Sequence, residues 1–134
     1  MATSPEQNKD VVRRFVFASD RLDFTVIDEI VADDYVDHVP GTANGREHLK
    51  TYLTGLADAF PDMRREIVQI IADGDLVATV NRVSGVQKRD FGRFPSKGNQ
   101  FEIEVARIFR IADGCIAEHW EVVDNASIER QLTA

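Results

Sequence analysis

Two Asp-Gly dipeptides, each flanked by runs rich in isoleucine and valine, constrain the fold of this chain most strongly. Asp-Gly is a common two-residue loop of a β-hairpin, because such a loop needs residues that accept positive φ angles. The second half of the chain is therefore predicted to form two long antiparallel hairpins. The predicted strands are 64–72 and 76–84 around Asp73-Gly74, and 101–112 and 115–123 around Asp113-Gly114.

The first half of the chain has helical periodicity instead. Ser4, Pro5 and Gln7 form a helix start signal, with Ser4 as N-cap and Gln7 at the capping-box position. Apolar residues then recur at helical spacing in three segments. We expect helices that begin near Pro5, near Asp23 and after an Asn44/Glu47 cap pair, the last ended by Pro61, and a short strand at 34–39.

Three helices followed by two hairpins predict an α+β fold. We expect a cone-shaped barrel, in which a strongly curved antiparallel sheet has the N-terminal helices packed over its concave face. The 134 residues suffice for one hydrophobic core, so residues 1–134 are predicted to form one domain. A cone of this kind encloses an apolar cavity, which is typical of small-molecule sites.

Composition and motifs exclude several functional classes. The chain has 16 basic and 23 acidic side chains, a net charge of −7, so we expect neither a nucleic-acid partner nor a membrane partner. One cysteine, Cys115, rules out an internal disulfide, and no zinc-ligand spacing or phosphate-binding loop is present. The N-terminus lacks a signal-peptide pattern. These features predict a soluble cytoplasmic protein without metal or cofactor.

Strand parity groups candidate site residues on one face of the second hairpin. If Asp113-Gly114 is a two-residue turn, Arg107 lies opposite Trp120. The shared face then carries Ile103, Val105, Arg107, Phe109, Glu118, Trp120, Val122 and Asp124. Apolar walls raise the pKa of a carboxyl group, and an arginine among them can polarise a carbonyl, so this face suits acid–base chemistry. A single β-bulge would reverse part of this assignment.

Four segments resemble a known family in their order and spacing. These are DYVDHVP at 34–40, AFPD at 59–62, IADGD at 71–75 and FRIADGCIAEHWEVVD at 109–124. They resemble the SnoaL-like polyketide cyclases and the related predicted ester cyclases of the nuclear-transport-factor-2-like (cystatin-like) superfamily. The resemblance extends from Asn8 to Leu132 and implies the same α+β cone.

The resemblance also implies a catalytic residue. In the cyclases, an aspartate at the end of the strand that contains Glu-His-Trp moves a proton during an intramolecular aldol closure. In this sequence that aspartate matches Asp124, which precedes a predicted helical tail and is alternatively an N-cap. The family also tends to carry Gly-Thr-His where this chain has Gly85-Val86-Gln87, so a glutamine replaces the histidine.

Further residues are candidates for the site, each with an alternative. His38 ends a short strand near the expected cavity mouth, and we place it with Asp124 and Arg107 as a catalytic candidate. His119 falls on the opposite face under the predicted register, where we expect a packed or hydrogen-bonded structural histidine, and a role in the ligand pocket is the alternative. Trp120 is predicted to form an aromatic pocket floor. The remaining predicted pocket residues are Glu118, Phe109, Val105, Val122, Phe15 and Tyr35.

Three functional hypotheses follow. The first is a small cofactor-free enzyme that cyclises or isomerises an apolar carbonyl compound, with Asp124 as acid and base. The second is a non-catalytic ligand-binding or assembly module, which Gln87 supports. The third is an epoxide-hydrolase-like site, which needs a carboxylate beside Arg107, and Glu118 is its candidate. We also expect a homodimer, because Val68, Ile70 and Ile108 leave the second sheet face apolar.

The segment 85–100 is predicted to be a long loop between the two hairpins. A loop of this length in a small domain is usually functional or mobile. Its four bases, Lys88, Arg89, Arg93 and Lys97, are expected to be solvated, with a carboxylate-bearing ligand as the alternative. The acidic cluster of Asp33, Asp34, Asp37 and His38 lacks the spacing of a calcium loop and is expected to be a solvated junction.

Overall fold

The computed structural model describes residues 2–134 and contains helices on one face of a five-stranded sheet. The helices are α1 (Pro5–Arg21), α2 (Phe24–Ile30), α3 (Arg46–Ala59) and α4 (Asn125–Thr133). The strands are β1 (Val31–Asp37), β2 (Arg64–Asp73), β3 (Leu76–Val86), β4 (Gln100–Ala112) and β5 (Cys115–Val123). None of the helices in this part of the chain is long and apolar enough to span a bilayer.

The helices begin where side chains can satisfy free backbone N–H groups. Ser4 and Gln7 form a reciprocal capping box at the start of α1, as predicted. Asp23 caps α2 by accepting a hydrogen bond from the Val26 N–H. The N-cap of α3 is Gly45 and makes no side-chain cap bond. The predicted cap residue Asn44 instead accepts a hydrogen bond from the Asp37 N–H at 2.9 Å.

The sheet has the strand order β1-β5-β4-β3-β2. The two predicted hairpins are confirmed, and β3 pairs with β4 across the loop that joins them. Asp113 and Gly114 both have positive φ angles, 52° and 78°, as a tight hairpin loop requires. The strand β1 was expected to start at Asp34, but it starts at Val31 and pairs with β5 in parallel.

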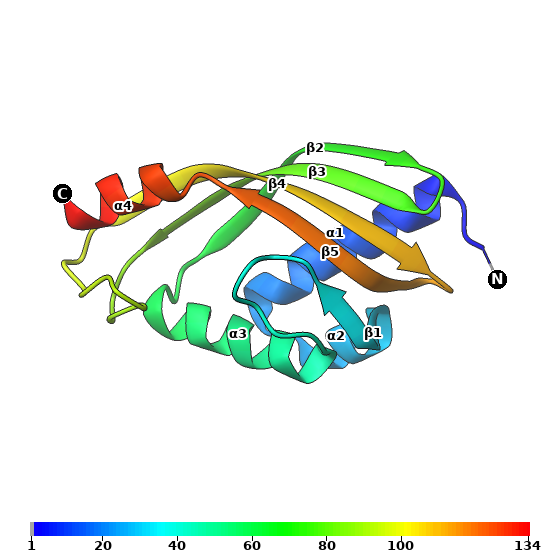
Figure 1. Cartoon of the computed structure of the whole chain (residues 1–134), viewed down its shortest axis with the longest axis horizontal. Helices are drawn as coiled ribbons and strands as arrows, with labels where there is room; N and C mark the ends of the chain where they lie inside the picture. Colours follow the sequence, from blue (N-terminus) through cyan, green and yellow to red (C-terminus); the bar gives the residue numbers. More distant parts are fainter. Residues whose placement is uncertain (1) are drawn as a thin grey trace.

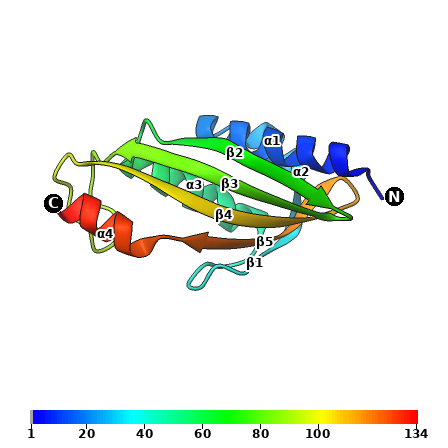
Figure 2. The same ribbon diagram turned by 90° about the horizontal axis from the view of Figure 1, so that it is seen from above.

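Helices α1, α2 and α3 cover the concave face of the curved sheet (Figure 1). Viewed from above, the sheet lies over these helices, and α4 sits at the end of the molecule opposite the N-terminus (Figure 2). The main core cluster joins α1, α2 and α3 to the sheet and includes Val12, Phe15, Ile27 and Phe109. A second cluster around Phe60 and Phe101 fills the α4 end. The predicted α+β cone is thus confirmed.

Two bulges set which side chains face the helices. The pairing of β4 with β5 shifts at Ala117, because Ile111 pairs with Ile116 whereas Arg110 pairs with Glu118. One extra residue reverses the faces of every residue beyond it. Arg107 therefore lies opposite Glu121 and not opposite Trp120, so the predicted register of β5 is wrong by one residue. A similar shift at Val68 in β2 turns Ile70 toward the core.

Candidate active site

A partly open cavity lies between the concave face of the sheet and the helices. Its volume is about 160 Å³, and apolar side chains form most of its wall. The polar side chains that line it come from six elements and the loop after β1: Ser19, Tyr35, Asp37, Thr42, Tyr52, Arg65, Arg107, His119 and Glu121. An apolar cavity with a few convergent polar groups is the usual form of a small-molecule site.

Asp37 and His119 form a buried acid–imidazole pair in this cavity. Parallel pairing of β1 with β5 places the two residues opposite each other. Asp37 Oδ1 lies 3.4 Å from His119 Nδ1, and the two side chains are only 8% and 11% exposed, respectively. A carboxylate in this position can orient an imidazole ring and balance the charge that the ring gains with a proton.

Two further contacts hold the Asp37 carboxylate. The Val39 N–H donates to Oδ1 at 3.0 Å, and the Tyr35 hydroxyl donates to Oδ2 at 3.1 Å. Burial disfavours the charged form of Asp37, but the contacts with His119, Val39 and Tyr35 outweigh it and lower the pKa of this carboxyl. Burial and the negative charge of Asp37 raise the pKa of Tyr35. Asp37 is therefore an ionised acceptor beside a neutral phenol.

His119 presents a ring nitrogen that has no partner in the described part of the chain. Its ring stacks against Phe109, with 5.0 Å between centroids, and more distantly against Tyr35. Both ring nitrogens are buried and make no hydrogen bond with residues 2–134; Nδ1 has the 3.4 Å contact with Asp37, whereas Nε2 has no such contact. A buried polar atom of this kind normally has a partner, so the unpaired Nε2 in a cavity wall is a candidate ligand contact.

Arg107 and Glu121 form a second buried pair next to the first. They pair across β4 and β5, two residues along from Phe109 and His119, and their side chains point to the same face. Arg107 Nε donates to Glu121 Oε1 at 2.8 Å, with side-chain exposures of 11% and 15%. Glu121 thus fixes the guanidinium, and both residues line the cavity. A fixed guanidinium can stabilise negative charge on a ligand oxygen.

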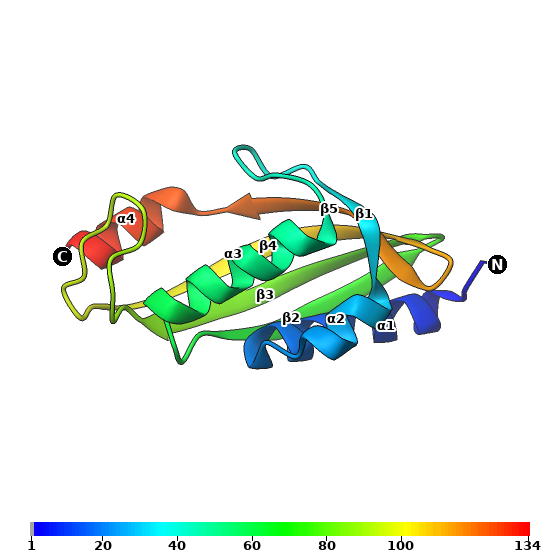
Figure 3. The same cartoon turned by 90° about the horizontal axis from the view of Figure 1, so that it is seen from below.

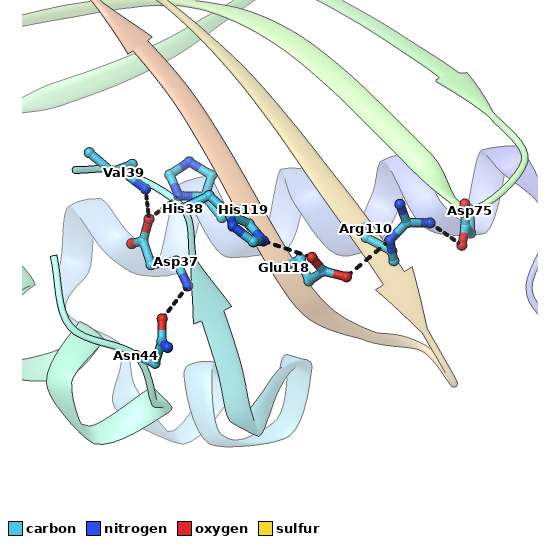
Figure 4. Close-up of polar contacts among 8 residues, drawn as sticks. All are labelled: Asp37, His38, Val39, Asn44, Asp75, Arg110, Glu118 and His119. Carbon is cyan, nitrogen blue, oxygen red and sulfur yellow. Dashed lines mark hydrogen bonds and ion pairs between the residues drawn. The ribbon is translucent and has the colours of Figure 1, made fainter.

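The opposite face of β5 carries a separate polar network (Figure 4). Glu118 accepts from Arg110 at 3.2 Å and lies 2.7 Å from His38 Nε2, and Arg110 also binds Asp75 at 2.8 Å. The His38 ring stacks on Trp120 with 4.6 Å between centroids. None of these five residues lines the cavity. The network therefore fixes the outer side of β1 and β5.

The structure divides the sequence-predicted site residues into two groups. Val105, Arg107, Phe15, Tyr35 and His119 line the cavity, and Phe109 lies directly behind His119. Glu118, Trp120 and Val122 lie on the outer face, because the bulge at Ala117 reverses β5, and Val122 is 74% exposed. His38 belongs to this outer group. Trp120 therefore does not form the aromatic floor of the cavity that was predicted for it.

Asp124 is the N-cap of α4 and does not line the cavity. Its carboxylate accepts hydrogen bonds from the Ser127 N–H at 3.0 Å and from the Ser127 hydroxyl at 2.6 Å. These bonds from Ser127 lower the pKa of Asp124, whose side chain is exposed to solvent. The capping alternative therefore describes its position, and the geometry does not support the acid–base role expected for it.

Sequence reasoning missed Asp37, Glu121 and Arg65 as cavity residues. Arg65, which pairs with Asp20 at 2.7 Å, comes from a strand whose residues were assigned no site role. Asp37 was read only as part of an acidic cluster. The sequence did not indicate that Asp37 pairs with His119 through the parallel pairing of β1 with β5. Within residues 2–134, no group of three or more metal-ligating side chains is placed to hold a metal ion.

Comparison with known proteins agrees with the fold. Residues 9–132 match the model of the SnoaL-like polyketide cyclase family. IdmH of Streptomyces antibioticus, a proposed polyketide cyclase, is 30% identical, with a TM-score of 0.85 over 96% of this chain and 99% of its own. TsrD of Streptomyces laurentii is 23% identical, with a TM-score of 0.89 over 97% of each chain. No match was found among curated proteins.

The substitution Asp37→Asn tests the charge on Asp37 through the pH dependence of stability. Because the pKa of Asp37 is lowered below 3.8, its charge stabilises the fold above that pH, and this contribution is lost as pH falls through the folded-state value. We expect the variant to lose about 1–3 kcal/mol at pH 7 and less than that at pH 3. Urea unfolding at both pH values measures this difference.

The exposed neighbour Asp34 provides the control for that experiment. Asp34→Asn removes a carboxylate from the same strand and should leave the free energy of unfolding at pH 7 nearly unchanged. An Asp37→Asn deficit that is equal at pH 7 and pH 3 would contradict the assigned charge state.

A pair of substitutions tests the capping role of Asp124. Asparagine caps helices about as well as aspartate, whereas alanine cannot accept the Ser127 N–H. We expect Asp124→Asn to keep the thermal midpoint and Asp124→Ala to lower it by a few degrees. Differential scanning calorimetry decides the matter, and equal midpoints for all three proteins would argue against a cap.

Proposed function

Because the chain belongs to the SnoaL-like polyketide cyclase family, we propose that it catalyses acid–base chemistry on an apolar carbonyl compound bound in the cavity. The observation that carries this proposal is the buried, unpartnered Nε2 of His119, with Asp37 behind the ring. The likeness to IdmH, itself a proposed polyketide cyclase, supports the same class of reaction. The reaction we propose is an intramolecular aldol closure, which is a net isomerisation.

In this mechanism His119 is the base and then the acid. Its Nε2 takes a proton from the carbon next to a ligand carbonyl, and Asp37 balances the charge of the resulting imidazolium. The enolate carbon attacks a second carbonyl carbon of the same molecule and forms a carbon–carbon bond. The new alkoxide then takes the proton back from the imidazolium. Substrate and product have the same composition, so the step needs no oxidant or reductant.

Arg107 stabilises the enolate oxygen in this mechanism. Glu121 holds its guanidinium on the cavity side of β4, next to the pair formed by Phe109 and His119. The surrounding apolar wall excludes water and strengthens such an interaction. The negative charge that develops on the enolate is therefore stabilised by two cations. One is the fixed guanidinium of Arg107, and the other is the imidazolium that His119 forms when it takes the proton.

A hydrolytic function is the alternative that the Arg107–Glu121 pair favours. An epoxide-hydrolase-like site requires a carboxylate beside Arg107 to activate water. Glu118, the candidate from the sequence, lies on the outer face, but Glu121 lies 2.8 Å from Arg107 inside the cavity. Mass spectrometry separates the two functions, because hydrolysis adds one water to the substrate and cyclisation leaves its mass unchanged.

Hydrogen–deuterium exchange into acetophenone tests the proposed base. The methyl protons next to its carbonyl exchange with D₂O through the enolate, and ¹H NMR follows their loss. We expect the wild-type protein to accelerate this exchange over buffer and His119→Gln to reduce the accelerated rate by about 10²–10⁴-fold. Binding of acetophenone should remain similar in the variant, which separates a lost base from a lost site.

A second histidine serves as the control. His48 lies on α3 and does not line the cavity, so His48→Gln should exchange acetophenone protons at the wild-type rate. Wild-type exchange by His119→Gln would reject His119 as the base. Binding of acetophenone without any acceleration by the wild-type protein would favour a non-catalytic binding module.

We also propose that two copies pair through the outer face of the sheet. This face exposes Val68, Ile71, Ile108 and Val122, with Trp120 beside Ile108. Ile70, which we had assigned to this face, packs against the core instead. Adjacent exposed apolar side chains on one face of a sheet are typical of a protein–protein contact.

Sedimentation equilibrium tests the dimer. We expect twice the 15.1 kDa chain mass at micromolar concentration, and a shift toward the single-chain mass in Val122→Asp, which places a charge in the contact. The control Thr54→Asp adds the same charge on the exposed side of α3 and should remain dimeric. A wild-type protein at the single-chain mass would contradict the pairing.

A further inference from the structure

The loop of residues 87–99 closes the end of the cavity that lies away from His119. Phe101, near this loop, and Phe109, beside His119, are eight residues apart on β4, which is roughly 25 Å along a strand. Figure 3 shows the loop between β3 and β4 at the same end as α4 and the last turns of α3. The cavity therefore has the Asp37–His119 pair at one end and a group of phenylalanine rings at the other.

Phe91 is the side chain by which this loop reaches the cavity. Its ring packs edge-on against Phe60 at 5.6 Å, and Phe60 packs edge-on against Phe101 at 5.1 Å. All three rings line the cavity. Phe60 is held by α3 and Phe101 by β4, whereas Phe91 is held only by its loop. Phe91 is thus the aromatic wall residue with the least backbone support.

Gln87 fixes the loop that carries Phe91. The glutamine is completely buried, and its Nε2 donates to the Phe94 carbonyl at 2.8 Å. Its backbone N–H donates to the Asn99 carbonyl at 2.9 Å, and its own carbonyl accepts from Ser96 Oγ at 3.3 Å. One residue therefore ties the middle and the far end of the loop to the end of β3.

The tip of the loop is a small turn that presents Phe91. Phe91 and Phe94 exchange backbone hydrogen bonds at 3.0 and 2.9 Å, and Gly92 between them has a φ angle of +54°. Gln87 thus holds Phe94 by a hydrogen bond, and Phe94 in turn holds the backbone of Phe91 by two hydrogen bonds. A change at Gln87 should loosen the turn and, with it, the aromatic wall.

Cavity size makes this wall important for a ligand. The volume of about 160 Å³ is close to the roughly 150 Å³ of an engineered cavity that binds benzene. A ligand with one ring fits this space, whereas a ligand with several fused rings must displace part of the wall. Close-packed helices and strands resist such displacement, so Phe91, on the loop, is the wall side chain that we expect to move.

We propose that Phe91 is a specificity-determining residue that sets the upper size of the ligand, and that Gln87 is the residue that positions it. The proposal rests on the proposed function only in assigning the ligand to this cavity. The proposal gives a role to Gln87, the glutamine that replaces the histidine found in many members of the SnoaL-like family. Gln87 acts through the loop and makes no contact with the ligand.

Three ketones of increasing length test the proposal by calorimetric titration. They are acetophenone, 2-acetylnaphthalene and 2-acetylanthracene, with one, two and three fused rings. We expect the wild-type protein to bind acetophenone more tightly than 2-acetylanthracene. Phe91→Ala should tighten 2-acetylanthracene by about tenfold or more and change acetophenone by less than about threefold, because only the long ketone reaches the removed ring.

Phe94→Ala is the matched control. It removes the same ring from the same turn but keeps the Phe94 carbonyl that Gln87 binds, and Phe94 does not line the cavity. We expect the ratio of its affinities for 2-acetylanthracene and acetophenone to equal that of the wild-type protein. An unchanged ratio in Phe91→Ala would overturn the size role, as would failure of all three ketones to bind.

Gln87→Leu tests the positioning role, since leucine fills a roughly similar volume but cannot donate to the Phe94 carbonyl. We expect it to shift the ratio in the same direction as Phe91→Ala, and to add nothing in the double variant, because both act on one wall. A wild-type ratio in Gln87→Leu would reject its role. These measurements depend on binding and not on turnover. They would therefore still test the proposal if His119 were shown not to be the base.

Discussion

The backbone pairing of β4 with β5 is the constraint on which the site depends. One extra residue at Ala117 turns His119 and Glu121 toward the helices and sends Glu118 and Trp120 outward. The core accepts this arrangement because Ile116 and Phe109 remain buried on the concave side. Without the bulge, Glu118 would take the place of His119 opposite Phe109, and Trp120 would take the place of Glu121 opposite Arg107.

This register separates two polar networks that share one strand. On the concave side, Asp37 contacts His119 and Arg107 contacts Glu121, each pair largely shielded from water. On the convex side, the partly exposed His38, Glu118 and Arg110 connect β1, β5 and β4. The outer network holds β1 beside β5 without occupying the site. That pairing in turn places Asp37 next to His119, so this buried pair depends on contacts on both faces.

Much of the fold could be predicted because its signals are local. The capping box at Ser4, the apolar spacing of α1 and α3 and the Asp-Gly loops each act within a few residues. The inward face of β4 could also be predicted, since Val105, Arg107 and Phe109 follow strict alternation. The face of β5 could not, because its two faces are similarly mixed and no side-chain pattern marks a bulge. Asp37 was missed since a parallel pairing between distant segments leaves no local trace.

Contacts between bound acetophenone and the protein test the central claim most directly. In a ¹³C-edited NOESY spectrum, the account predicts cross-peaks from the acetophenone methyl protons to the His119 ring. It predicts none to the Trp120 indole, which lies on the other side of the sheet. Cross-peaks to Trp120, with none to His119, would contradict the register of β5 and the site built on it.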